Sequence, residues 1–180
     1  MDGIRPIQAT YTQLIPFSEL ANGEASSIRN NFIRKMVDVA SGELKMTADR
    51  LVVRDIRPKD DLDYTYQTWS EETGSTVGTY ETMTTGTNTT DRWIGFFGIK
   101  TDPNPPVSMI KFNIGGSDRA IWVIEGLKTE DDMTGFSPGG VVIPPSQPYT
   151  ISRYVIQASY NALIVLKGIV VEPRGKVISP

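Results

Sequence analysis

The chain has 180 residues, of which 39% are hydrophobic and 22% charged, and its formal net charge is −3. These values are typical of a single domain with its own core, and the sequence lacks the basic stripe that strong nucleic-acid binding needs. The chain contains neither histidine nor cysteine. This composition excludes disulfides, Ser–His and Cys–His nucleophiles, and the usual zinc sites.

The sequence predicts neither a membrane span nor a secretion signal. Its longest strongly apolar stretch, Ala162–Val171, includes Lys167 and Gly168 and is far shorter than the roughly 20 residues that a bilayer span needs. The first six residues do not form the apolar core of a signal peptide. We therefore expect a soluble chain.

Residues 1–24 are predicted to form an N-terminal arm, and residues 25–180 one domain. The apolar side chains of the arm follow no clear period and are interrupted by Pro6, Pro16 and Gly23. Such a segment has no core of its own, so it must lie on its own domain or on a neighbour. The first arrangement is the more common one.

Ser26–Val39 is predicted to be a short helix. Its apolar side chains fall on one helical face, at Ile28, Phe32, Ile33, Met36 and Val37. Ser26 or Ser27 is expected to cap the start, and Gly42 to end the helix. Core packing is the expected role of the apolar face, and partner binding is the alternative.

Two strands are predicted next, over Arg50–Arg57 and Tyr64–Ser70. An acidic turn with Asp60, Asp61 and Asp63 separates them. Carboxylates suit calcium, but the turn lacks the glycine and the distal glutamate of an EF-hand loop. We expect a solvated turn here, with calcium binding as the alternative, and we interpret Glu130-Asp131-Asp132 in the same way.

Threonine dominates the segment that follows. Nine of the eighteen residues from Thr73 to Thr90 are threonine, and few are large and apolar. The composition predicts a surface loop or a flat β-ribbon, since the branched threonine side chain favours extended backbone. Asn88-Thr89-Thr90 matches a glycosylation sequon, which we interpret as a chance match without a secretion signal.

The rest of the chain is predicted to be a series of strands separated by glycine and proline. They cover Arg92–Ile99, Val107–Ile114, Arg119–Leu127, Val141–Ile143, Tyr149–Gln157 and Ala162–Glu172. A tight turn at Gly115-Gly116 and a polar loop over Lys128–Gly140 lie between them. With the earlier segments, this spacing predicts an all-β sandwich of about eight antiparallel strands, the number in a jelly roll.

No set of side chains predicts catalysis. A glycosidase needs only two carboxylates, but Glu125 is the one acid in an apolar strand, and we expect it to reach solvent at the strand's end. Trp69, Trp93 and Trp122 would suit a sugar-binding platform, yet core packing is the favoured interpretation. We assign no catalytic, cofactor-binding or metal-binding residue and predict that the protein is not an enzyme.

The order of these features resembles the small single jelly-roll capsid proteins of icosahedral viruses. An arm precedes about eight strands with threonine- and glycine-rich loops, and the closing stretches run from Val141 to Ser152 and from Gly168 to Gly175. The pattern covers about residues 45–180 and is most similar to the capsid proteins of membrane-containing phages and archaeal viruses.

The resemblance implies a capsid subunit that self-assembles or co-assembles into an icosahedral shell. Its partners would be copies of itself and other virion proteins, without a cofactor, a small-molecule substrate or direct contact with nucleic acid. Its location would be the virion, after a soluble stage in the host cytoplasm. Two alternatives stay open, namely a phage tail, baseplate or decoration protein and a carbohydrate-binding β-sandwich module with exposed Trp and Tyr.

Overall fold

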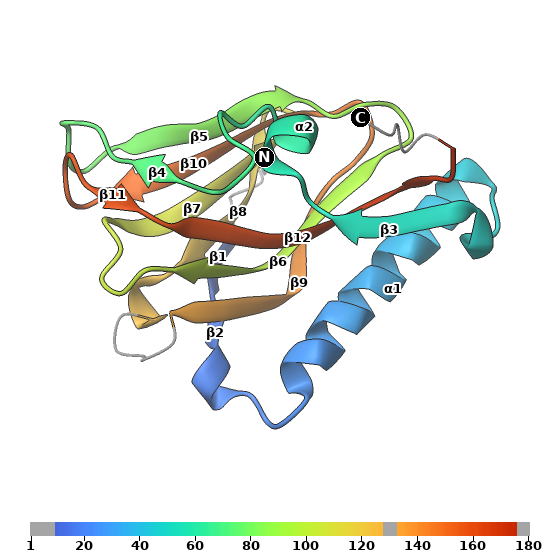
Figure 1. Ribbon diagram of the computed structural model, residues 1–180, viewed down its shortest axis with the longest axis horizontal. Coiled ribbons are helices and arrows are strands. Elements are labelled where there is room, and N and C mark those ends of the chain that lie inside the picture. The colour runs from blue at the N-terminus through green and yellow to red at the C-terminus, as the bar shows by residue number, and fades with distance from the viewer. Residues whose placement is uncertain (1–9, 128–132, 176–180) are drawn as a thin grey trace, which may run out of the picture.

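The computed structural model describes residues 10–127 and 133–175 of the chain. Two five-stranded β-sheets pack face to face, and helix α1 lies against the outside of one of them (Figure 1). The prediction of an all-β sandwich is confirmed. The acidic segment Glu130-Asp131-Asp132 lies outside the described residues.

The strands of the two large sheets come from all parts of the chain. Sheet A has the order β1-β8-β7-β10-β5, with the bounds Thr10–Gln13, Ser117–Val123, Val107–Ile114, Pro148–Val155 and Tyr80–Thr87. Sheet B has the order β2-β9-β6-β12-β3, with the bounds Ile15–Pro16, Thr134–Ile143, Trp93–Thr101, Ile164–Pro173 and Leu51–Asp55. Neighbouring strands are antiparallel except β1 and β8, which are parallel. Strands β4 (Glu71–Glu72) and β11 (Asn161–Ala162) form a separate two-stranded ribbon.

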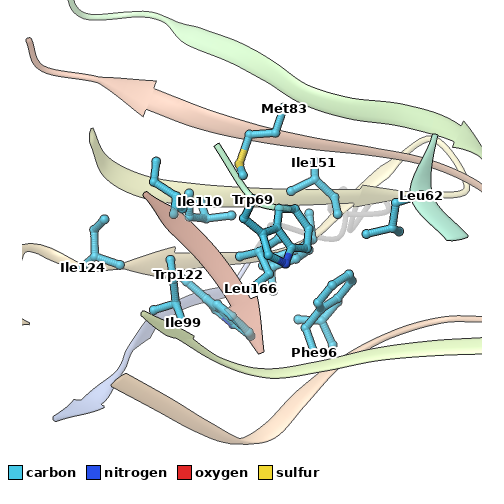
Figure 2. Packing of buried hydrophobic residues seen from close by; sticks show 14 of the residues in the cluster. Leu62, Trp69, Met83, Phe96, Ile99, Ile110, Trp122, Ile124, Ile151 and Leu166 are labelled. Carbon is cyan, nitrogen blue, oxygen red and sulfur yellow. The ribbon is translucent and has the colours of Figure 1, made fainter. Parts of the chain in front are cut away.

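The main core fills the space between the inner faces of the two sheets (Figure 2). Phe112 and Trp122 of sheet A meet edge to face at 4.7 Å between ring centroids, and Phe96 of sheet B lies 5.4 Å from Phe112. All three side chains are fully buried. Alternation along each strand produces this layer, because successive side chains point to opposite faces of a sheet.

Helix α1 spans Glu24–Leu44 and packs on the outer face of sheet B. It is longer at both ends than the predicted helix. Gly23, not a serine, is the N-cap, and the helix runs through Gly42 to a left-handed Lys45. The predicted apolar face is confirmed as core, with its most buried residues at Ile28, Phe32, Met36 and Ala40.

Two glycines of sheet B let the helix approach closely. A Cβ atom at Gly95 would lie 2.7 Å from the ring of Phe32 and would also clash with the sulfur of Met36. One at Gly140 would clash with Cε2 of the same ring and lie 2.6 Å from the carbonyl oxygen of Phe96. Such contacts are shorter than van der Waals packing allows. Gly140 also has a positive φ of 59°, which L side chains rarely adopt. The Phe32 ring therefore packs directly against the backbone of these two glycines.

The described part of the arm lies on its own domain. Strand β1 pairs with β8 of sheet A, β2 pairs with β9 of sheet B, and Leu14 between them is buried in the main core. The short helix η1 (Phe17–Glu19) follows. The arm thus adds one edge strand to each sheet and crosses from one sheet to the other.

Two other predictions need correction. Tyr64–Ser70 is not a strand, because Tyr64 and Trp69 pack together at 5.0 Å in the core instead of alternating across a sheet. Both predicted forms of the threonine segment occur, since residues 73–79 form a loop and β5 a strand. Strand β9 extends through the glycine-rich part of the predicted loop, where a bulge between Phe136 and Val141 absorbs the extra residues.

Candidate interaction surfaces

The acidic turn is a short helix built around a buried carboxylate. Helix α2 spans Pro58–Leu62, and Asp61 within it is only 3% exposed. Arg54 and Arg92 donate hydrogen bonds to its carboxylate at 2.7 to 3.1 Å, and the backbone N–H of Arg57 donates at 2.7 Å. The prediction of a solvated turn is therefore wrong for Asp61, although Asp60 and Asp63 are exposed.

This ion-pair cluster ties distant parts of the chain together. Arg54 also bonds Glu172 of β12 at 2.8 Å, and hydrogen bonding to Asp61 raises the pKa of Arg54 above its ordinary value. Arg92 bonds the side chain of Asn88, whose amide donates to three backbone carbonyl groups. The sequon asparagine is thus buried in structural hydrogen bonds, as a chance match predicts.

A second buried cluster joins β10 to the β4–β11 ribbon. Arg153 donates to the carboxylates of Glu71 and Glu81 and, at 2.8 Å, to the carbonyl of Glu72. The hydroxyl of Tyr64 donates to Glu71 at 2.7 Å. Burial raises the pKa of Glu71, and burial likewise raises that of Tyr64. These donors occupy the carboxylate of Glu71, so we assign the cluster a role in stabilising the fold.

The remaining predicted site residues lie apart from one another. Glu125 is exposed in the short helix η3 (Glu125–Leu127), just after β8, as expected for an acid that reaches solvent. Trp69, Trp93 and Trp122 are at most 9% exposed and belong to the core, and Figure 2 shows two of them among aliphatic neighbours. Within residues 10–127 and 133–175, no three acidic side chains gather in a way that would hold a metal ion.

One candidate surface is a groove at the start of α1, which we name the Phe17 groove. It has a volume of about 510 Å³ and lies between the first turns of α1 and sheet B. Its lining includes three phenylalanines and three cations, namely Phe17, Phe97, Phe136, Arg29, Lys100 and Lys167, together with Trp69. An apolar floor under a cationic rim suits an amphipathic, negatively charged ligand. No signal in the sequence marked this groove, because its lining comes from η1, α1 and four strands that are far apart in the chain.

A second groove, the Val39 groove, lies between the C-terminal half of α1 and strand β9. Its volume is about 770 Å³, and Val39, Leu44, Trp93, Val142 and Pro144 are among its lining residues. Lys35, Glu43 and Asp91 provide charges of both signs. This mixed lining favours no particular ligand charge.

A third surface is the outer face of sheet A, which we name the tyrosine face. The register places Met109 beside Tyr154 and Tyr154 beside Tyr80, and Tyr11 of the arm is 66% exposed at the edge of the same face. Tyr80 and Tyr154 meet edge to face at 5.2 Å. The ammonium group of Lys111 lies 4.1 Å from the centre of the Tyr80 ring.

The fourth surface surrounds the β4–β11 ribbon, and we name it the ribbon end. Four of the exposed large apolar side chains belong to it, namely Tyr66, Val77, Tyr160 and Leu163. Backbone hydrogen bonds connect the segments that carry three of them, from Thr73 to Tyr160, from Gly78 to Val155 and from Asp102 to Leu163. Tyr66 shares a shallow depression with Glu72 and Asn161 of the ribbon. Exposed apolar groups gathered at one end are typical of protein–protein interfaces.

Comparison with known proteins finds no matching family model, no matching curated protein and no matching solved structure. None of the helices in the described part of the chain is long and apolar enough to span a membrane.

Proposed function

We propose that this protein is a capsid subunit with a single jelly-roll fold, which assembles with its own copies or with other virion proteins into an icosahedral shell. The observation that carries the fold is the strand order. Eight strands of the described chain have five or more residues, and we number them 1 to 8 in chain order: β3, β5, β6, β7, β8, β9, β10 and β12. In sheet B the neighbours follow the order 1-8-3-6, and in sheet A they follow the order 2-7-4-5. This is the arrangement expected of a jelly roll, in which an eight-stranded hairpin folds over on itself.

The arm and the ribbon end support an assembly role. Sheets A and B end in β5 and β3 on the side away from the arm, and unpaired edge strands are sites where another chain adds a strand. The exposed apolar side chains of the ribbon end supply surface for a neighbour. Both buried ion-pair clusters hold segments of the fold together, so we assign them to stability.

The direct test is the size of the purified chain as its concentration rises, measured by sedimentation velocity and negative-stain electron microscopy. We expect discrete oligomers or closed particles. The variant Tyr160→Ser with Leu163→Ser should weaken assembly without unfolding, since both side chains are about 40% exposed. Arg119→Ser, an exposed change on β8, is the matched control.

Removal of residues 1–9 tests whether the arm reaches a neighbour. The truncation leaves Leu14 and both arm strands in place, unlike removal of the whole arm. We expect weaker assembly of a folded chain. A strictly monomeric protein, together with a truncation that changes neither stability nor incorporation into particles, would remove the support for this proposal.

The same microscopy distinguishes a capsid subunit from a tail, baseplate or decoration protein. Those proteins would form tubes or decorate particles and would not form closed shells. The three tryptophans of the expected sugar platform are buried and cannot contact a glycan. One observation still favours the carbohydrate-binding alternative, namely the tyrosine face. Glycan binding that Tyr11→Ala and Tyr154→Ala abolish, in a chain that stays monomeric, would favour that alternative.

A further inference from the structure

We propose that the Phe17 groove binds a small anionic amphiphile, with one alkyl chain and one carboxylate head, as in a free fatty acid. The site does not include the ribbon end, and it touches the edge strand β3 only through Asp55 at the end of that strand.

The floor is a row of three phenylalanine rings. Phe136 lies in the middle, 6.4 Å from Phe97, to which it is nearly parallel, and 6.4 Å from Phe17. Phe97 and Phe136 are held in the cluster under α1, while Phe17 is 47% exposed on η1. Phe97 and Phe136 are each 5% exposed, so Phe17 supplies most of the accessible aromatic surface against which an alkyl chain would pack.

Two lysines on adjacent strands line the same groove. Lys100 of β6 is paired with Val165 of β12, and Lys167 follows two residues later on the same face. Diagonal neighbours of this kind have Cβ atoms about 7–8 Å apart. Within the described residues, no carboxylate lies within 4.0 Å of either ammonium group. An anionic head between them would relieve the repulsion of two like charges.

The charge of the whole lining has the same sign. Arg29 on α1 makes an exposed ion pair of 3.7 Å with Asp55, and solvent screens this contact. Three cationic side chains and one carboxylate give the groove a net charge of +2, although the chain as a whole carries −3. The lining therefore selects an anion.

The size of the groove selects a small molecule. Its volume of about 510 Å³ lies within the range of roughly 300–1,000 Å³ that is usual for small-molecule sites. Trp69 contributes to the lining and is 9% exposed, so its fluorescence offers a signal for binding.

The experiment titrates the full chain with dodecanoate, below its micelle-forming concentration, by isothermal calorimetry and tryptophan fluorescence. We expect one site per chain, an affinity that rises about fourfold per methylene from octanoate to dodecanoate, and no fluorescence response in Trp69→Phe. Dodecyltrimethylammonium, which has the same chain and the opposite charge, and acetate, which has no chain, should not bind.

Two variants locate the site. Lys100→Glu with Lys167→Glu should weaken dodecanoate binding by about tenfold or more, because it removes both partners of the head. Phe17→Ser should also weaken dodecanoate binding, because it removes the exposed ring against which the alkyl chain packs. Circular dichroism checks that the variant is folded. Lys35→Glu, an exposed change in the Val39 groove, is the control and should bind as the wild type does.

Equal affinity of the double-lysine variant and the Lys35→Glu control would overturn the proposal, as would equal binding of dodecanoate and dodecyltrimethylammonium. Binding to anionic phospholipid vesicles without binding of free dodecanoate would also overturn it, because the groove would then recognise a membrane surface.

Discussion

Arg54 and Asp61 form a two-point ion pair, in which Nη1 and Nη2 of the guanidinium lie 2.7 and 2.8 Å from the two carboxylate oxygens. Arg92 donates to the same Oδ1 of Asp61 at 3.1 Å, and Arg54 is paired with Glu172 as well, so two arginines share two buried carboxylates. This geometry is the strongest form of hydrogen-bonded ion pair in proteins. It fixes α2 against sheet B and closes the side of the sandwich between β3 and β5.

Asp61→Asn should therefore destabilise the fold strongly. The amide keeps the size of the carboxylate but leaves Arg54 and Arg92 without their shared charge, and breaking a buried pair from one side costs about 3–5 kcal/mol. Urea unfolding followed by circular dichroism measures the loss. The control is Asp60→Asn, an exposed change next in the chain that should stay within about 0.5 kcal/mol of the wild type. Equal stability of the two variants would contradict the role given to Asp61.

Gly95→Ala should destabilise the protein by displacing Phe32 of α1. The added methyl group would lie 2.7 Å from the ring, and overpacking of this kind costs about 1–3 kcal/mol. Gly42→Ala is the matched control with the opposite sign. Gly42 is exposed in α1 and has open space around it, so the substitution should stabilise the protein by about 0.5–1 kcal/mol. A double-mutant cycle of Gly95→Ala with Phe32→Leu should recover part of the loss, and strict additivity would argue against the contact.

Tyr149 should make stability fall between pH 10 and pH 12. Burial, followed by the charge of Asp63, raises its pKa to about 12, whereas an unfolded tyrosine ionises near its ordinary value of 10. Below pH 10 the phenol is neutral in both states, so its contribution is fully present there. As the pH rises, the unfolded state loses its proton first, and the stabilisation disappears by about pH 12.

Urea midpoints at pH 9, 10, 11 and 12 check this, with Tyr149→Phe as the comparison. The variant should lose less stability than the wild type across this window, because phenylalanine does not ionise. Parallel curves for the two proteins would show that Tyr149 does not contribute to the alkaline loss.

Periodic patterns predicted the fold better than they predicted the surfaces. Val107–Ile114 alternates strictly and was correctly assigned, and the one-sided face of α1 was found from the spacing of Phe32 and Met36. Tyr64–Ser70 alternates as well, yet it forms a loop in which Tyr64 packs on Trp69 and donates a hydrogen bond to Glu71. Alternation alone does not distinguish such a locally bonded loop from a strand.

The candidate surfaces escaped prediction for the same physical reason. Lys100 and Lys167 are 67 positions apart in the chain, and only the register of β6 with β12 brings them together. Likewise, Asp61 could not be distinguished from Asp60 in an acidic turn, because the arginines that bury it come from β3 and from the segment before β6. Composition indicated that common catalytic designs are excluded, but it carried no information on which faces remain exposed.

Leu14→Ala should destabilise the protein by about 2–5 kcal/mol, because the leucine carries the arm into the main core and the change leaves a cavity there. The control is Tyr11→Ala, at an exposed position of β1, which should change the stability only slightly. The dependence on concentration is the informative measurement. If Leu14 packs within its own chain, the difference in unfolding midpoint between the wild type and Leu14→Ala stays the same at every protein concentration, because association through other surfaces stabilises both proteins alike. If neighbouring copies exchange their arms instead, this difference grows with concentration, since the variant then loses part of the association itself. A constant difference in a protein that still assembles would assign assembly to the ribbon end and the sheet edges, and not to the residues from Tyr11 to Pro16.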